Sequence, residues 1–192
     1  MAVQGGTRTL TNSTVCYDVK LVLLGSSGAA AVTLKTVNIG ECQLKINIWD
    51  TAGQERYKSL VPIYYRNSNA AIVVYDISSL ESFERAKQIL NELSNRLSDD
   101  VVIALAGNKS DLFDKQRKIT TKSAQELASN HGLIFMEVSA KTGENISRLF
   151  MAVAEKLAQR SLAEKLAQRS QHFPVVPVRK EPENRSKCCS TS

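Results

Sequence analysis

The stretch 49–57 places an acid, a glycine and an amide directly after the alternating segment 44–49, which has the pattern of a strand. In an open parallel sheet, ligands bind beyond the carboxyl ends of the strands. Asp50 is therefore a candidate metal ligand, and Gly53 allows a backbone N–H group to approach a phosphate. Gln54 could then orient a water molecule. The alternative is a turn in which Asp and Gly have only conformational roles.

A second polar stretch, Gly-Asn-Lys-Ser-Asp at 107–111, follows the apolar segment 101–106. The carboxylate of Asp111 could accept two hydrogen bonds from the N1 and N2 edge of guanine, which adenine does not offer. Taken alone, this composition is also that of an ordinary turn. The same holds for Ser-Ala-Lys at 139–141, where the last predicted strand ends. The hypothesis of a guanine site therefore depends on all three stretches occurring together.

Strand-like and helix-like segments alternate along the chain and predict an α/β fold. The segments 31–37 and 43–49 flank a turn signal and predict an antiparallel hairpin. Ser78 and Glu81 predict a capping box at the start of a helix. We expect a doubly wound, mostly parallel sheet with one antiparallel edge strand. The other predicted strands are 18–24, 70–76, 101–106 and 133–138, and further helices are predicted over 122–130 and from about 145.

Composition and charge exclude some classes of partner. The 192 residues, 43% of them hydrophobic and 23% charged, are typical of one globular domain with extensions. The net charge of +6 comes without any basic run that is interleaved with aromatic residues, so we predict no nucleic-acid partner and favour an acidic membrane surface. Cys16 and Cys42 are interpreted as free thiols, because the four cysteines form no disulfide framework.

An exact repeat interrupts the end of the domain. The octapeptide Ala-Glu-Lys-Leu-Ala-Gln-Arg-Ser occupies 154–161 and again 163–170. Nine residues turn a helix by about two and a half turns, so Leu162 and Leu166 should point away from the first copy's apolar stripe. We expect packing to fade near Arg160. The predicted organisation is a disordered segment 1–17, a domain 18–160, a repeated helical extension 161–173 and a disordered tail 174–192.

In this order and at strand ends, the three stretches resemble the guanine-nucleotide motifs of the small GTPases. Trp49 and the trailing Glu-Arg-Tyr resemble the Rab family in particular, as do residues 64–66 and 82–83. Within that family, the sequence is most similar to the endosomal branch. The likeness runs from about Val19 to Lys156. It implies a small G-protein fold, GTP or GDP with Mg²⁺ as ligands, and a membrane-bound switch in vesicle and endosomal traffic.

The resemblance also implies a role for each motif residue. Asp50 would act on Mg²⁺ through water, and Gln54 would be the catalytic residue that positions the attacking water. Gly53 would meet the γ-phosphate, Asp111 would read the guanine, and the stretch 139–141 would support its ring. The full set of implied nucleotide-binding residues is Gly25, Gly53, Asn108, Lys109, Asp111, Ser139, Ala140 and Lys141.

The tail carries a further resemblance. Cys188 and Cys189, behind basic residues, resemble a Rab double geranylgeranylation site, although they are not a strict C-a-a-X ending. Two lipid chains would anchor the protein stably to the cytoplasmic face of membranes, and the resemblance implies endosomal membranes. Escort, exchange and effector proteins are implied partners, and unprenylated or escort-bound protein would be cytosolic. The alternative is an incidental cysteine pair.

The chain departs from the family pattern after Gly25. A phosphate loop, G-x-x-x-x-G-K-[ST], would place Gly, Lys and Ser or Thr at 30–32, where this chain has Ala30, Ala31 and Val32. Only eighteen positions separate Gly25 from Gln43, and a crossover alone takes a dozen or more residues. The segment 28–37 instead resembles the Rab sequence just after the first switch. We therefore expect the first helix to be missing, with an apolar patch on the alternate residues of 20–24.

These departures leave more than one function open. The leading hypothesis is a Rab-type GTPase in which nucleotide binding is impaired and hydrolysis is weak or absent. The alternative is a non-catalytic interaction protein derived from a Rab scaffold. A shortened isoform or a faulty gene model would also explain the gap and the repeat. A phospho-receiver is disfavoured, because its first strand should end in an acidic cluster rather than at Gly25.

Overall fold

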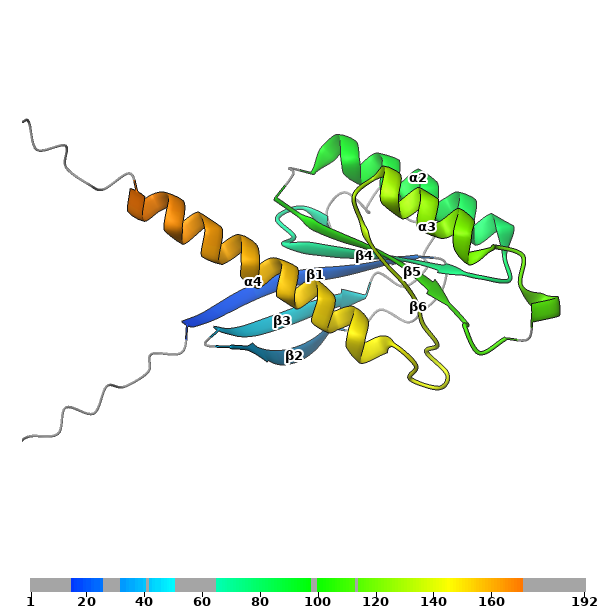
Figure 1. Cartoon of the computed structure of the whole chain (residues 1–192), viewed down its shortest axis with the longest axis horizontal. Helices are drawn as coiled ribbons and strands as arrows, with labels where there is room; N and C mark the ends of the chain where they lie inside the picture. Colours follow the sequence, from blue (N-terminus) through cyan, green and yellow to red (C-terminus); the bar gives the residue numbers. More distant parts are fainter. Residues whose placement is uncertain are drawn as a thin grey trace, which may run out of the picture.

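The computed structural model describes residues 15–25, 32–40, 42–50, 65–97, 100–112 and 114–170. Their strands form one six-stranded sheet in the order β2-β3-β1-β4-β5-β6 (Figure 1). All neighbouring strands are parallel except the pair β2 and β3. The predicted α/β fold with one antiparallel edge strand is confirmed. The strands are β1 (Val15–Gly25), β2 (Val32–Ile39), β3 (Cys42–Asp50), β4 (Ala70–Asp76), β5 (Val102–Asn108) and β6 (Ile134–Glu137).

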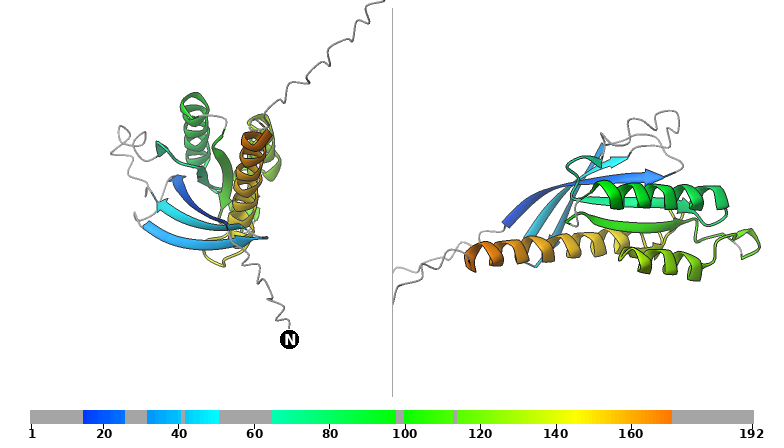
Figure 2. Two further views of the ribbon diagram at one scale, coloured as in Figure 1. Left: turned by 90° about the vertical axis from the view of Figure 1, so that its left-hand side faces the viewer. Right: turned by 90° about the horizontal axis from the view of Figure 1, so that it is seen from above.

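Helices cover both faces of the sheet (Figures 1 and 2). The helices are α2 (Leu80–Arg96), α3 (Thr121–Asn130) and α4 (Ile146–Ser170), with a short 3₁₀ helix η2 (Asp114–Gln116). Alternate residues of each strand pack into two separate cores, as the two-residue period of a strand requires. In β4, Ile72 lies in the core that includes α4, whereas Val73 lies in the core that includes α2 and α3.

The start of α2 differs from the predicted capping box. Ser79, not Ser78, is the N-cap, and its hydroxyl accepts a hydrogen bond from the backbone N–H of Ser82. Ser78 is instead held by Asp76, whose Oδ1 accepts hydrogen bonds from the Ser78 backbone N–H at 2.8 Å and from its hydroxyl at 2.6 Å. The prediction placed the cap one residue too early because it took no account of Asp76.

The link between β1 and β2 sets the topology of this half of the sheet. β2 lies at the edge beyond β3, so the chain crosses one strand between Gly25 and Val32. That step is about 10 Å at the usual spacing of strands. Among the described residues, no helix lies between β1 and β2. The connection thus differs from the crossover helix that usually follows a parallel strand.

The predicted apolar patch on β1 is wrong. Leu21 and Val22 are fully buried, and they lie on opposite faces of the sheet. Leu21 belongs to the same core as Leu44 of β3 and Val153 of α4. Helix α4 packs against β2 and β3 as well as β5 and β6, and so crosses the face on which the patch was expected. This placement explains how the face is covered without the missing helix.

The apolar stripe of α4 agrees with the prediction over its first copy of the repeat. Leu149, Val153 and Leu157 are buried against the sheet, with Ile146 and Phe150 packed beside them. Arg160 and Ser161 are partly exposed and Ala163 is exposed. The side chains of Leu162 and Leu166 lie outside the described part of the chain. None of the described helices is long and apolar enough to cross a membrane.

We predict that deleting residues 163–171 lowers the melting temperature by less than about 2 °C, because the first copy of the repeat supplies the described packing. The matched comparison is Leu157→Ala, which should cost about 2–5 kcal/mol of unfolding free energy because it leaves a cavity against the sheet. Thermal and urea unfolding followed by circular dichroism measure both. A loss of several degrees on deletion would mean that the second copy also packs.

Candidate functional site

The predicted site residues gather at the carboxyl end of the sheet. Gly25, Asp50 and Asn108 are the last residues of β1, β3 and β5, and these three strands run in the same direction. Asp50 lies beside Leu23, two residues before the end of β1. Ser139 follows β6 at the same edge. The fold therefore brings together residues that are far apart in the sequence.

Asn108 joins the two loops of the predicted base site. Its side-chain oxygen accepts hydrogen bonds from the backbone N–H of Lys109 at 2.8 Å and of Ala140 at 3.0 Å. The backbone N–H of Ser110 also donates to the carbonyl of Val138 at 3.0 Å. The loops after β5 and β6 are thus held together by bonds within the chain, without any contribution from the phosphate side.

Asp111 is held in place by the loop after β6. The hydroxyl of Ser139, which is fully buried, donates a hydrogen bond of 2.5 Å to its Oδ1. Lys141 approaches Oδ2 at 3.8 Å. The Ser139 hydrogen bond keeps the pKa of Asp111 below its usual range, so the carboxylate is an anion at neutral pH. Two carboxylate oxygens offer about four acceptor positions, of which the Ser139 hydroxyl takes one.

Asp76 is a site residue that the sequence interpretation did not single out. It ends β4, and its Oδ2 lies 2.5 Å from Nζ of Lys109. Burial by itself would raise the pKa of Asp76, but hydrogen bonds from Lys109 and Ser78 outweigh this and lower it. Lys109 has a φ of 70°, in the left-handed region that is uncommon for residues other than glycine. The signal available in the sequence was an acid at the end of a buried strand.

An ion pair at the end of β6 helps to position the loop that follows this strand. Arg117 donates two hydrogen bonds to the carboxylate of Glu137, at 2.7 and 3.0 Å, and both side chains are largely buried. The side-chain amide of Asn145 donates to the carbonyl of Glu137 at 3.0 Å. A two-pronged contact of this kind fixes orientation as well as distance. The end of β6, and with it Ser139, is therefore well positioned.

Packing explains two glycines of the site without any ligand. A Cβ on Gly25 would lie 2.5 Å from the carbonyl oxygen of Val74, its partner in β4. A Cβ on Gly107 would lie 2.7 Å from the hydroxyl of Tyr75. A larger residue at position 25 would therefore require the backbone to move, whereas one at position 107 would require the Tyr75 side chain to move. The predicted contact of Gly25 with a nucleotide stays a prediction.

Few residues of the predicted phosphate side belong to the described part of the chain. Val32, the position that should carry the Mg²⁺-binding hydroxyl, is the first residue of the edge strand β2. Asp50 is partly exposed at the end of β3, and the described residues hold no group of three or more acidic, histidine or cysteine side chains that could bind a metal ion. Gly53, Gln54, Cys188 and Cys189 lie outside the described residues. The described residues thus contain the base side of the predicted site, whereas weak binding of the phosphates and Mg²⁺ stays a prediction.

Comparison with protein families gives an independent finding. A model of the Ras family matches residues 20–159, which is more than half of the chain. The matched segment begins within β1 and ends within α4. It contains the loops after β5 and β6, together with Asp50 and Asp76.

We predict that Ser139→Ala raises the pKa of Asp111, because it removes the hydrogen bond that favours the anion. The folded-state pKa of Asp111 lies below the unfolded value of about 3.9, so this group stabilises the fold above that value. The contribution is lost as the pH falls through the folded-state pKa.

Carbon NMR titration of the Asp111 carboxyl group measures this pKa directly. Ser110→Ala is the matched control, because the Ser110 hydroxyl donates to Glu144 at 3.1 Å in the same pair of loops. It should leave the Asp111 titration unchanged. An unaltered pKa in Ser139→Ala would contradict the assignment of this hydrogen bond.

Proposed function

The chain belongs to the Ras family of small GTPases, and on this premise we propose that it is a Rab-type, membrane-anchored protein of vesicle and endosomal traffic whose nucleotide binding is impaired. In this proposal the protein recognises guanine but holds the phosphates and Mg²⁺ weakly. Hydrolysis of GTP is then weak or absent. The Rab assignment is based on the resemblance around Trp49 and on the cysteine pair in the tail.

The observation that supports impaired binding most strongly is the contrast between the two halves of the site. Asp111 and Asn108 are fixed by Ser139 and Ala140 through side-chain hydrogen bonds. On the phosphate side, only six residues separate the end of β1 from the start of β2. That length leaves no room for the helix whose N-terminal amides bind phosphate in P-loop proteins.

The expected loss of affinity is large. A charged hydrogen bond contributes roughly 1.5 to 3 kcal/mol. Losing three such contacts, from the lysine, the hydroxyl that binds Mg²⁺ and the helix amides, removes on the order of 5 to 9 kcal/mol, or some three to six powers of ten in affinity. Binding of the guanine base alone would remain. In this proposal Asp50, Gly53 and Gln54 keep their places in the site, but the phosphates and Mg²⁺ on which they would act are bound only weakly.

A second candidate function is a non-catalytic interaction protein that keeps the scaffold of the family. It is favoured by the finding that both faces of the sheet are packed even though the described chain has no helix between β1 and β2. A folded scaffold without phosphate binding could still present a surface to partners such as escort or effector proteins. Complete absence of guanine binding would favour this function over the first.

We predict that replacing Cys188 and Cys189 together by Ser releases the protein from membranes into the cytosol, because these residues are the proposed sites of geranylgeranyl attachment. Fractionation of cells that express each form measures the distribution. The control is Cys16→Ser, which removes a thiol outside the tail and should leave the distribution as in the wild type. Unchanged membrane association of the double variant would rule out anchoring through this pair.

We also predict that the purified protein retains no stoichiometric nucleotide and that its affinity for a fluorescent GTP analogue hardly changes when Mg²⁺ is removed. Hydrolysis should be undetectable, and Gln54→Leu should not alter this result. The reason is that the groups that sense the phosphates and Mg²⁺ are missing.

Two variants separate base recognition from other binding. Asp111→Ala should abolish the residual binding, whereas Ser110→Ala should preserve it, because Ser110 contacts Glu144 and not Asp111. Tight, Mg²⁺-dependent binding by the wild type would show instead that another segment rebuilds the phosphate site, and it would refute the proposed impairment.

A further inference from the structure

A cavity of about 180 Å³ lies at the end of the sheet opposite to the base loops. It is bounded by the last turns of α2, the start of β5, the segment between α3 and β6, and the last described side chains of α4. Its wall combines apolar side chains of the sheet and α2 with polar and basic groups. Its charged side chains are Lys156 and Arg160 of α4. The imidazole of His131, from the segment after α3, also lines it, and the lining residues include no carboxylate.

Arg160 carries a buried group without a partner. Its Nη1 atom is inaccessible to solvent and has no hydrogen-bond acceptor in the described part of the chain. A guanidinium group stays protonated throughout the accessible pH range. Burying a charged donor without an acceptor is costly, so native proteins rarely leave such a group unpaired. The cavity beside Arg160 is the natural place for the missing acceptor.

The surroundings specify the chemistry of that acceptor. Lys156 lies one helical turn before Arg160, so both cations can face the same side of α4. Ser94 of α2, which also lines the cavity, already donates its hydroxyl to the carbonyl of Leu90 at 2.9 Å. The cavity is smaller than the roughly 300–1,000 Å³ of sites for drug-sized ligands, so it suits one small group and not a nucleotide.

We propose that this cavity binds a small oxyanion, a phosphate or carboxylate group, through Arg160 and Lys156. The site is separate from the proposed guanine site. The cavity includes Val102, the first residue of β5, whereas Asn108 at the other end of the strand belongs to the base loops. Seven residues of strand separate the two sites by about 20 Å. Binding at one site can therefore be followed without occupying the other.

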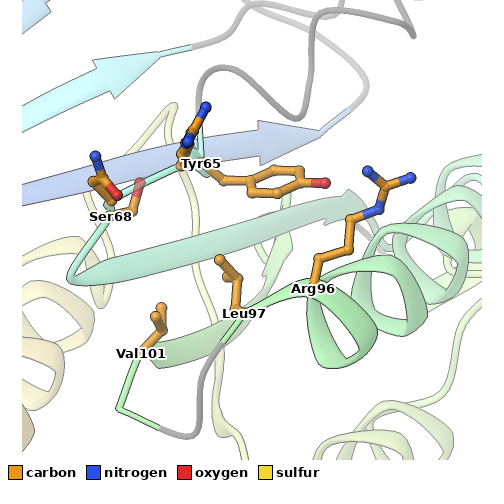
Figure 3. A pocket seen from close by; sticks show the side chains of 7 residues that line it. Tyr65, Ser68, Arg96, Leu97 and Val101 are labelled. Atoms are coloured by element: carbon orange, nitrogen blue, oxygen red, sulfur yellow. The ribbon is translucent and has the colours of Figure 1, made fainter.

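The neighbouring cavity does not offer the same chemistry. It has a volume of about 470 Å³ and shares Leu97 and Val101 with the first (Figure 3). Arg96 on its wall pairs with Glu92, with Nε and Oε1 3.6 Å apart, and the hydroxyl of Tyr65 donates to the same carboxylate at 2.9 Å. Glu92 already balances Arg96, and Arg66, which also lines this cavity, is exposed to solvent, so neither arginine shows the buried, unpartnered nitrogen that marks the oxyanion site.

The first test uses the full-length wild-type protein and inorganic phosphate, with acetate in a parallel arm and chloride at equal ionic strength as the reference. We expect phosphate or acetate to shift the backbone amide NMR signals of Leu97, Gly132 and Arg160 in a saturable way. The signals of Lys109 and Asp111 should stay in place. Absence of saturable shifts at the cavity in both arms, or shifts confined to the base loops, would overturn the proposal.

The repeat supplies a matched pair of variants for the second test. Arg160→Met should weaken phosphate binding by at least about tenfold, because one charged hydrogen bond is lost. Arg169→Met changes the same residue of the same octapeptide, nine positions later and half a turn round the helix, and should bind as the wild type does. Equal binding by Arg160→Met and wild type would refute the role of Arg160. If Arg160→Met does not fold, the wild-type titration decides the question by itself.

Discussion

The short passage from Gly25 to Val32 is the constraint on which the rest of the structure depends. Six residues suffice to cross one strand and start the edge strand β2, but a crossover helix needs a dozen or more. The strand order is unaffected, but the face of the sheet that the missing helix would cover must be covered by another element. Helix α4 supplies it by packing against β2 and β3 as well as β5 and β6. Stability and ligand binding therefore depend on different parts of the molecule.

The base loops are independent of that passage. Asn108, Asp111 and Ser139 bond to one another across the ends of β5 and β6, and Asp76 holds Lys109 from the end of β4. These contacts require only the half of the sheet that the passage leaves unchanged. The proposed loss of phosphate binding in this Ras-family chain is therefore compatible with an intact base side. The two parts of the proposed site are separable because different strands support them.

Local sequence patterns predicted most of the fold, but they could not predict contacts between residues that are far apart in the sequence. Alternation around residues 38–41 predicted the hairpin, and the apolar stripe from Leu149 to Leu157 predicted the packed side of α4. The apolar stripe does not indicate which strands α4 crosses. The prediction therefore missed that α4 covers this face, and the apolar patch expected on β1 was wrong. The interactions of Asp76 with Lys109 and Ser78, and the unpartnered Nη1 atom of Arg160, depend on groups brought together by the fold.

The central claim is that guanine, and not phosphate, provides the nucleotide affinity of this protein. The most direct measurement is the ratio of the dissociation constants of guanosine and GDP, determined by calorimetry on the same preparation in the presence of Mg²⁺. We expect a ratio within about one power of ten, since at most one weak phosphate contact of roughly 1.4 kcal/mol remains. GDP binding that is a thousandfold or more tighter than guanosine binding would contradict it.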